Sequence, residues 1–273
     1  MTDRSVNGIP MLGLGTFGRT GAEGIDALLA ALEIGYRHID TAQSYGTEAN
    51  VGEAVRRSGL PREDIFITTK VADTNLRTAD FLASVDKSLE TLGVDSIDLL
   101  LIHWPSKNDA VPFEEYMLPL AEVHERGQAK RIGVSNFPIA DLRRTDALIG
   151  PNRIATNQVE LHPYLQSPRL SGYALDIGLP LTAYMPLAKG KVSDDPTLTK
   201  IGEAHGVTAA AVALAFGMQE GRIVIPASSN PERLKSNFAA GGVTLDAEEM
   251  AAIRALDRGE RMINPEKSPV WDD

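Results

Sequence analysis

Four polar side chains that lie at or just beyond the ends of apolar, β-branched runs could together deliver a proton. They are Asp40, Tyr45, Lys70 and His103. A lysine ammonium beside a phenol lowers the pKa of the phenol, and a carboxylate beside the lysine keeps that lysine protonated and in place. Such a tyrosine donates a proton near neutral pH, which an ordinary phenol with a pKa of about 10 does poorly. With His103 bonded to the same oxygen, the set is suited to protonating a carbonyl oxygen that gains negative charge.

These four side chains become neighbours only if the runs are parallel strands of one sheet. Eight runs predict strands, at residues 12–16, 36–40, 64–70, 97–103, 131–134, 155–160, 179–184 and 222–226. Helical patterns separate them, among others at 22–34, 79–92, 114–126 and 208–218. Eight alternating strand and helix units predict an α/β fold, a (β/α)8 TIM barrel with a parallel eight-stranded sheet. We expect a single domain over residues 1–273, with an extra helix at 246–257 and a C-terminal tail in a loop.

In such a barrel the carboxyl ends of all strands converge on one pocket, so the polar residues there become mutual neighbours. Each residue also has a plainer interpretation. Asp40 alone could cap a helix or form a turn, and Tyr45 could be a core residue with a satisfied hydroxyl. Lys70 could be solvated and His103 could pack in the core. The plainer interpretations weaken because all four residues close successive strands of one predicted barrel.

A doubly wound sheet is the competing architecture, and it would need a glycine-rich phosphate-binding turn. The nearest candidate is Gly13, Gly15 and Gly18, whose spacing does not match G-x-G-x-x-G. The barrel is therefore the favoured fold.

Composition limits the classes of function. The net charge of −10 argues against general binding to nucleic acid or to an anionic membrane. The sequence has no cysteine, no apolar run near the roughly 18 residues of a membrane span, and no N-terminal signal pattern, so we expect a cytoplasmic protein. No exposed apolar edge or heptad is evident, and a monomer is expected. The remaining histidines lack metal-ligand spacing, so no metal site is expected; they are His38, His124, His162 and His205.

Six ordered motifs carry a resemblance to a known family. They read HIDTAQSYGTEANVGEA, ITTKV, LLLIHWP, RIGVSNF, TNQVELHPY and AYMPLA. In this order they resemble the aldo-keto reductases, from Gly13 to about Asn237 and into the tail. Within the family, LIHWPSKNDAV, IATNQVELHPYLQ and INPEKSPVWD are most similar to the bacterial branch that reduces 2,5-diketo-D-gluconate and methylglyoxal.

The resemblance implies an NADPH-dependent reduction of aldehydes and ketones to alcohols, in which the cofactor gives hydride and Tyr45 gives the proton. Lys70 and Asp40 would tune Tyr45, and His103 would orient the carbonyl. By the same resemblance, the cofactor-binding residues would be Gly15, Thr16, Ser135, Asn136, Gln158, Tyr184, Pro186, Leu187, Ser228, Arg233 and Asn237. Ser135, Asn136 and Gln158 would hold the carboxamide, and Tyr184 would stack on the ring. The substrate pocket would be walled by Phe17, Trp104 and Trp271.

Three positions depart from the family pattern. Ala227 stands where a lysine often pairs with the 2′-phosphate, which weakens the discrimination of NADPH from NADH. Arg233 can still meet the phosphate, assisted by Lys189 or Lys191, so NADPH is the expected cofactor and NADH an alternative. Met185 replaces a serine near the pyrophosphate, and the hairpin around residues 7–10 looks truncated.

Two other functions fit parts of the pattern. Lys70 could form a Schiff base in a barrel aldolase, although Asp40 would tend to keep that lysine charged. A nucleotide-binding regulatory protein could also share the fold, although the complete set of four catalytic residues argues against it.

Overall fold

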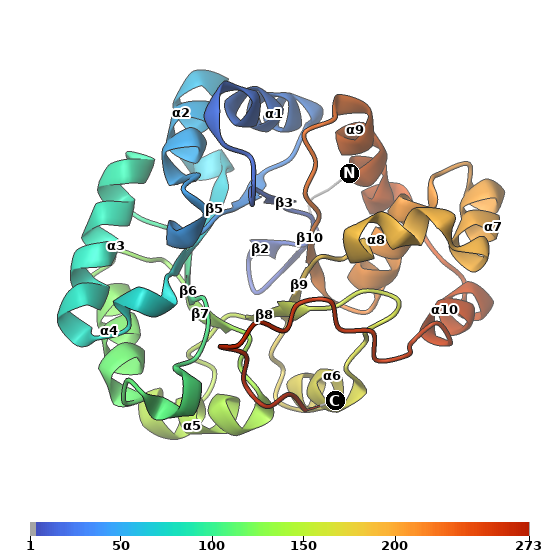
Figure 1. Cartoon of the computed structure of the whole chain (residues 1–273). Coiled ribbons are helices and arrows are strands. Elements are labelled where there is room, and N and C mark those ends of the chain that lie inside the picture. Colours follow the sequence, from blue (N-terminus) through green and yellow to red (C-terminus); the bar gives the residue numbers. More distant parts are fainter. Residues whose placement is uncertain (1–3, 273) are drawn as a thin grey trace.

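The computed structural model describes residues 4–272, and its centre is a barrel of eight parallel strands (Figure 1). The strands follow one another around the sheet in chain order. Their bounds are β3 Leu14–Gly15, β4 His38–Asp40, β5 Phe66–Val71, β6 Leu99–Ile102, β7 Ile132–Ser135, β8 Asn157–Glu160, β9 Leu181–Tyr184 and β10 Ile223–Ile225. Leu12, just before β3, bridges Val224 of β10 in parallel, and Gly13 N donates to Val224 O at 2.9 Å. These bonds join the last strand to the first, so the predicted (β/α)8 barrel is confirmed.

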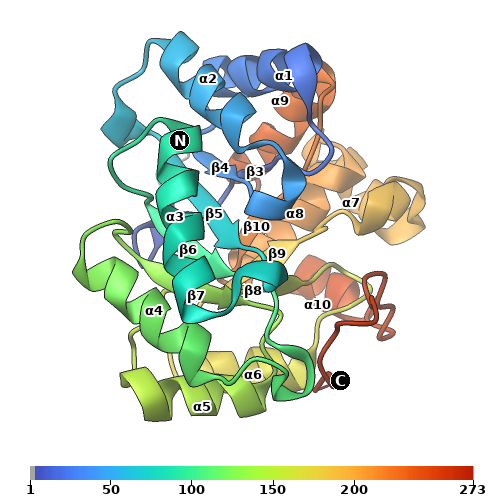
Figure 2. The same ribbon diagram turned by 60° about the vertical axis from the view of Figure 1, so that its left-hand side comes forward.

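Helices surround the strands, as Figures 1 and 2 show. They are α1 Gly21–Ile34, α2 Glu48–Ser58, α3 Thr78–Leu92, α4 Glu114–Glu125, α5 Ile139–Ile149, α6 Pro168–Asp176, α7 Pro196–His205, α8 Ala209–Gln219, α9 Pro231–Ala239 and α10 Ala247–Arg254. Short 3-10 helices are η1 Gln43–Tyr45, η2 Arg62–Asp64, η3 Asp73–Asn75, η4 Lys107–Asp109, η5 Ala188–Asp194 and η6 Ala240–Gly242. The expected extra helix is α10, which begins with a capping box between Asp246 and Glu249.

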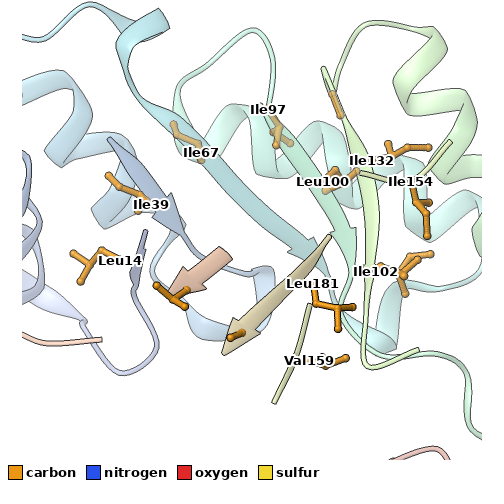
Figure 3. Packing of buried hydrophobic residues seen from close by; sticks show 14 of the residues in the cluster. Leu14, Ile39, Ile67, Ile97, Leu100, Ile102, Ile132, Ile154, Val159 and Leu181 are labelled. Carbon is orange, nitrogen blue, oxygen red and sulfur yellow. The ribbon is translucent and has the colours of Figure 1, made fainter. Parts of the chain in front are cut away.

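Alternation along the strands divides the core into two layers. Leu99 and Leu101 of β6 pack with Phe66, Ile223 and Ile225 in one buried cluster. Their neighbours Leu100 and Ile102 belong to the larger cluster between the strands and the helices, part of which Figure 3 shows. Full burial of one such side chain stabilises the fold by about 1.5–3 kcal/mol. The same alternation decides which polar residues point into the barrel.

A short hairpin lies at the end of the barrel where the strands begin. It pairs β1 (Ser5–Val6) with β2 (Ile9–Pro10) in antiparallel register. Asn7 and Gly8 both have positive φ, 51° and 70°, as a two-residue hairpin turn requires. Ile9 is fully buried and packs against Phe66, Leu99 and Ile223. The hairpin is present, with strands of only two residues each.

Within residues 4–272, no single helix is long and apolar enough to cross a membrane. Helices α7 and α8 reach that length and apolar character only when taken together, and a bend of 90° separates them. In the same part of the chain, no group of three or more His, Asp or Glu side chains is placed to hold a metal ion.

Candidate active site

The centre of the site is an ion pair between neighbouring strands. Asp40 is the last residue of β4, and Lys70 lies in β5. Alternation turns both side chains into the barrel, where Lys70 Nζ donates to Asp40 Oδ1 at 2.5 Å and to the backbone oxygen of Thr41 at 2.8 Å. Both residues are buried. The pair therefore holds the Lys70 ammonium inside the barrel near the carboxyl ends of the strands.

Gln158 occupies the other oxygen of the same carboxylate. It lies in β8, across the barrel, and its Nε2 donates to Asp40 Oδ2 at 2.7 Å. Asp40 thus receives one bond on each oxygen from opposite sides of the barrel, which restrains the carboxylate in position.

Tyr45 reaches the ion pair from η1, the short helix after β4. Gln43 holds this helix, because its Nε2 donates to Ser84 Oγ at 3.0 Å and its Oε1 accepts from the backbone N of Ala72 at 2.9 Å. The Lys70 ammonium lies 5.1 Å from the centroid of the Tyr45 ring. Tyr45 Oη is 3.5 Å from His103 Nε2, and His103 Nδ1 is 3.3 Å from Ser44 Oγ. The structure therefore brings all four predicted catalytic residues together.

The expectation of a lowered pKa for Tyr45 is wrong. Burial raises the pKa of Tyr45 above its ordinary value of 10, and the positive charge of Lys70 offsets only part of that increase. Desolvation disfavours the phenolate more than one nearby ammonium favours it. The phenol consequently keeps its proton at neutral pH, as a proton donor requires before reaction.

The pKa values of the other two titrating groups shift in opposite directions. Burial by itself would lower the pKa of Lys70. The electrostatic interactions with Asp40 and Tyr45 raise that pKa by more than burial lowers it, so the pKa is raised overall and the amine stays charged. Burial lowers the pKa of His103 to about 2, helped by the charges of Lys70 and Lys267. His103 is therefore a neutral imidazole throughout the physiological range.

Asn136 connects the strand ends next to His103. Its Nδ2 donates to the backbone oxygen of His103 at 3.0 Å, and its Oδ1 accepts from Tyr184 Oη at 2.9 Å. Ser135 Oγ donates to the backbone oxygen of Gln158 at 2.8 Å. Hydroxyl and amide groups from β7, β8 and β9 thus gather at one place beside the catalytic residues. Donors and acceptors of this kind match a carboxamide.

The residues expected at the adenosine end come from the β10–α9 segment. Ser228 is buried in the loop, Asn237 is buried in α9 and Arg233 is exposed near the start of α9. Asn230 Oδ1 caps this helix by accepting from the backbone N of Glu232 and Arg233, at 2.9 and 3.1 Å. An exposed arginine at a helix N-terminus is suited to binding a phosphate.

The remaining predicted cofactor residues lie beside these two groups. Gly15 ends β3 and packs against the segment after β10, since a Cβ built on it would lie 3.2 Å from Ile225 O. Thr16 is buried next to it, and Pro186 and Leu187 follow β9. Lys191, which was expected as an alternative to Lys189 for assisting at the phosphate, pairs with Glu260.

Three aromatic residues lie at the mouth of the barrel, which is the end where the strands finish and the four candidate catalytic residues meet. Phe17 is 68% exposed and meets the edge of Tyr45, with ring centroids 5.1 Å apart. Trp104, which directly follows His103 in the sequence, is buried. Trp271 from the tail packs against it, with ring centroids 6.2 Å apart. All three predicted wall residues are thus found near the catalytic set.

Sequence reasoning missed three residues that shape this mouth. Ser44 could have been noticed because it directly precedes Tyr45. Lys267 bonds Asp73 at 2.7 Å and lies 5.6 Å from the Trp104 ring, but the tail has no periodic pattern that would place it. Glu160, two residues after Gln158 on the same face of β8, binds the backbone of the tail.

A cavity of about 700 Å³ lies elsewhere, beside Asn7 and the starts of β7 and β8. Its cationic side chains are already engaged. Lys130 pairs with Asp98, Arg153 pairs with Glu125 and Arg131 donates to the backbone oxygen of Asn7. The catalytic set does not line this cavity.

The barrel and its residues place the chain in a family. The model of the Aldo/keto reductase family matches residues 11–258, and the chain belongs to this family of oxidoreductases, which act on carbonyl groups. It is 45% identical over 265 residues to methylglyoxal reductase DkgB of Escherichia coli O157:H7, covering 97% of this chain and 99% of that protein.

Solved structures agree with this assignment. The fold matches that of a protein assigned provisionally as 2,5-diketo-D-gluconic acid reductase B, with a TM-score of 0.93, 47% identity and coverage of 98% and 95% of the two chains. It also matches an aldo-keto reductase solved in complex with NADPH, with a TM-score of 0.87, 33% identity and coverage of 94% and 87%.

Proposed function

We propose that this protein uses NADPH to reduce small aldehydes and ketones to alcohols, with 2,5-diketo-D-gluconate and methylglyoxal-type carbonyls as substrates. The proposal depends above all on one observation: Tyr45 Oη and His103 Nε2 lie 3.5 Å apart, beside the buried pair of Lys70 and Asp40. Two similar proteins, a methylglyoxal reductase and a protein assigned provisionally as a 2,5-diketo-D-gluconic acid reductase, support the substrate class.

The donor set fits NADPH. Ser135, Asn136 and Gln158 offer the hydroxyl and amide groups that a nicotinamide carboxamide needs, and Tyr184 offers a ring beside them. When bound, the cofactor supplies a hydride to the carbonyl carbon. Gly15, Thr16, Pro186 and Leu187 would line its middle. Ser228, Arg233 and Asn237 would bind the adenosine phosphate.

Arg233 supports a preference for NADPH, because a planar guanidinium can bind the 2′-phosphate with two hydrogen bonds. Ala227 adds no charge at this end, so the preference should be modest and NADH should be accepted weakly. The relative solved with NADPH supports the same choice of cofactor.

The substrate oxygen would lie between Tyr45 Oη and His103 Nε2. Ser44 can donate to His103 Nδ1, which leaves the single imidazole proton on Nε2, directed at the carbonyl oxygen. Tyr45 then transfers its proton as negative charge develops on that oxygen. Lys70 stabilises the resulting phenolate by its charge, and Asp40 holds Lys70 in position.

Schiff-base chemistry at Lys70 is disfavoured by the same contacts. An amine nucleophile must be neutral, whereas the pKa of Lys70 is raised and its Nζ donates to both Asp40 and Thr41. The wild-type geometry favours the proton-donating role instead.

The test follows NADPH oxidation by absorbance with methylglyoxal and 2,5-diketo-D-gluconate offered separately, and with NADH in parallel. We expect turnover with NADPH that falls by at least about 10²-fold in Tyr45→Phe. Binding of NADPH to that variant, followed by fluorescence, should be nearly unchanged. Tyr173→Phe on α6 is the matched control and should keep full turnover. Equal turnover of Tyr45→Phe and the wild type would remove Tyr45 as the acid.

A further inference from the structure

The C-terminal tail (residues 261–272) follows α10 and runs back along the β7–β9 side of the barrel, as Figure 1 shows. It has no helix or strand of its own, so its position depends on contacts with other segments. Two of these contacts are ion pairs on the surface: Lys267 with Asp73, and Lys107 with Glu266. Pairs this exposed contribute little, at most about 1 kcal/mol each.

Glu160 provides a contact of a different kind. Its side chain is fully buried, yet its two carboxylate oxygens accept from consecutive backbone N–H groups of the tail. Met262 N donates to Oε1 and Ile263 N donates to Oε2, both at 2.8 Å. Bonds from neutral donors to a buried carboxylate are short and strong. A fully buried carboxylate therefore fixes the tail backbone at two consecutive residues.

His162 completes the environment of this carboxylate. Its Nε2 lies 3.1 Å from Glu160 Oε1, and the backbone N of Tyr164 donates to its Nδ1 at 3.3 Å. Because Nδ1 accepts, the imidazole proton is on Nε2 and is donated to Glu160. Three donors therefore satisfy a carboxylate that would otherwise be costly to bury.

The position of Glu160 links the tail to the catalytic residues. Glu160 is two residues beyond Gln158 on the same face of β8, and it is in register with Tyr184 of β9. Eight residues after Ile263, the tail places Trp271 against Trp104, which follows His103. At its end, the Asp272 carboxylate accepts from the backbone N of Ile139, at the start of α5.

We propose that Glu160 is a positioning residue, which fastens the tail across the mouth through Met262 and Ile263 and thereby holds Trp271 in the wall of the substrate pocket. The part concerning substrate depends on the reductase function proposed above. Because the Glu160 side chain is fully buried and both of its oxygens accept from protein donors, we expect it to touch neither substrate nor cofactor. Its loss should therefore weaken substrate binding and leave the chemical step nearly unchanged.

Tryptophan fluorescence tests the tail contact without any turnover. The chain has only two tryptophans, Trp104 and Trp271, and both lie at this contact. Glu160→Gln keeps the size of the side chain but turns one oxygen into an N–H donor that faces a backbone N–H. We expect acrylamide to quench the variant at least about twofold more strongly than the wild type, because an unfastened Trp271 becomes accessible. Far-UV circular dichroism should remain unchanged.

Ile263→Pro breaks the same contact on the side of the tail. Proline has no backbone N–H, so it deletes one of the two donors and leaves the barrel interior intact. It should increase quenching as Glu160→Gln does, and the double variant should not exceed the larger single effect, because both changes break one contact. Glu122→Gln, on the exposed face of α4, is the matched control and should behave as the wild type.

Steady-state kinetics then test the effect on substrate. In Glu160→Gln and Ile263→Pro we expect KM for the carbonyl to rise about tenfold, which corresponds to about 1.4 kcal/mol, with kcat changed less than about twofold. The same KM increase without a change in quenching would overturn the role of the tail, as would quenching that increases with an unchanged KM. If Glu160→Gln does not fold, the result for Ile263→Pro alone decides.

The two proposals fail in different ways. A wild-type protein that reduces no carbonyl would contradict the reductase function, and the quenching measurement would still decide whether Glu160 fastens the tail. Unchanged quenching in Ile263→Pro would reject the fastening role while the reductase function stands.

Discussion

Lys70 Nζ and Asp40 Oδ1 are 2.5 Å apart on adjacent strands, and neither side chain is more than 3% exposed. Removing two charges from water is expensive, and their attraction repays the cost only while both are present. The fold and the proposed chemistry therefore depend on the same pair.

Asp40→Asn should destabilise the protein, because it leaves the Lys70 charge buried without its counter-ion. We expect the free energy of unfolding to fall by about 3–5 kcal/mol. Urea denaturation followed by circular dichroism measures this change. Asp86→Asn is the control, since Asp86 is exposed and accepts a hydrogen bond from Gln128 on the surface. Equal midpoints for Asp40→Asn and the wild type would show that Lys70 is solvated or neutral.

Arg233→Ala should separate the two cofactors. If the guanidinium binds the 2′-phosphate, the Kd for NADPH rises about tenfold or more, while the Kd for NADH changes less than about twofold. Ala227→Lys should have the reverse effect and strengthen NADPH binding. Titration of cofactor fluorescence measures both constants. Lys235→Ala, on the same helix but paired with Glu232, is the control. Equal losses for both cofactors would mean that Arg233 does not bind the phosphate.

The pH profile of kcat should be level from about pH 5 to pH 9. The pKa of His103 is lowered to about 2, so the imidazole is already neutral at the acid end of this range. The pKa of Tyr45 is raised above 10, so the phenol keeps its proton at the alkaline end. Rates at saturating NADPH and substrate, with folding checked at each pH, test this expectation. An inflection near pH 6.5 that disappears in His103→Gln would contradict it.

Asn136 combines a strained backbone with three hydrogen bonds. Its φ is 63°, a left-handed conformation that glycine adopts freely and alanine does not, and its side chain bonds His103 O, Ser135 Oγ and Tyr184 Oη. Asn136→Gly and Asn136→Ala should therefore weaken NADPH binding alike. Asn136→Ala should be less stable than Asn136→Gly by about 1 kcal/mol. Thermal unfolding measures the difference, and equal stabilities would mean that the backbone relaxes.

The fold and the proximity of the four candidate catalytic residues could be predicted from the sequence for one physical reason. Eight β-branched runs alternate with helical patterns, and the parallel strands of a barrel bring their carboxyl ends together. Asp40, Lys70 and His103 stand at or next to those ends, so local patterns were enough to predict that they meet. The family motifs then indicated candidate cofactor residues, which lie around the same end of the barrel and along the segment from β10 to α9.

The tertiary structure decided what depends on burial and on contacts between distant segments. Whether the pKa of Tyr45 rises or falls is a balance between desolvation and the charge of Lys70, and the depth of burial cannot be read from residue types. Lys191 pairs with Glu260, a contact between segments 69 residues apart that no local pattern predicted. Glu160 looked like the end of a strand, and only the path of the tail, 102 residues later, revealed which backbone groups its carboxylate binds. The sequence by itself determined the barrel and the meeting of its four candidate catalytic residues through local periodicity, whereas long-range packing determined the pKa shifts of those residues and the contacts of the tail.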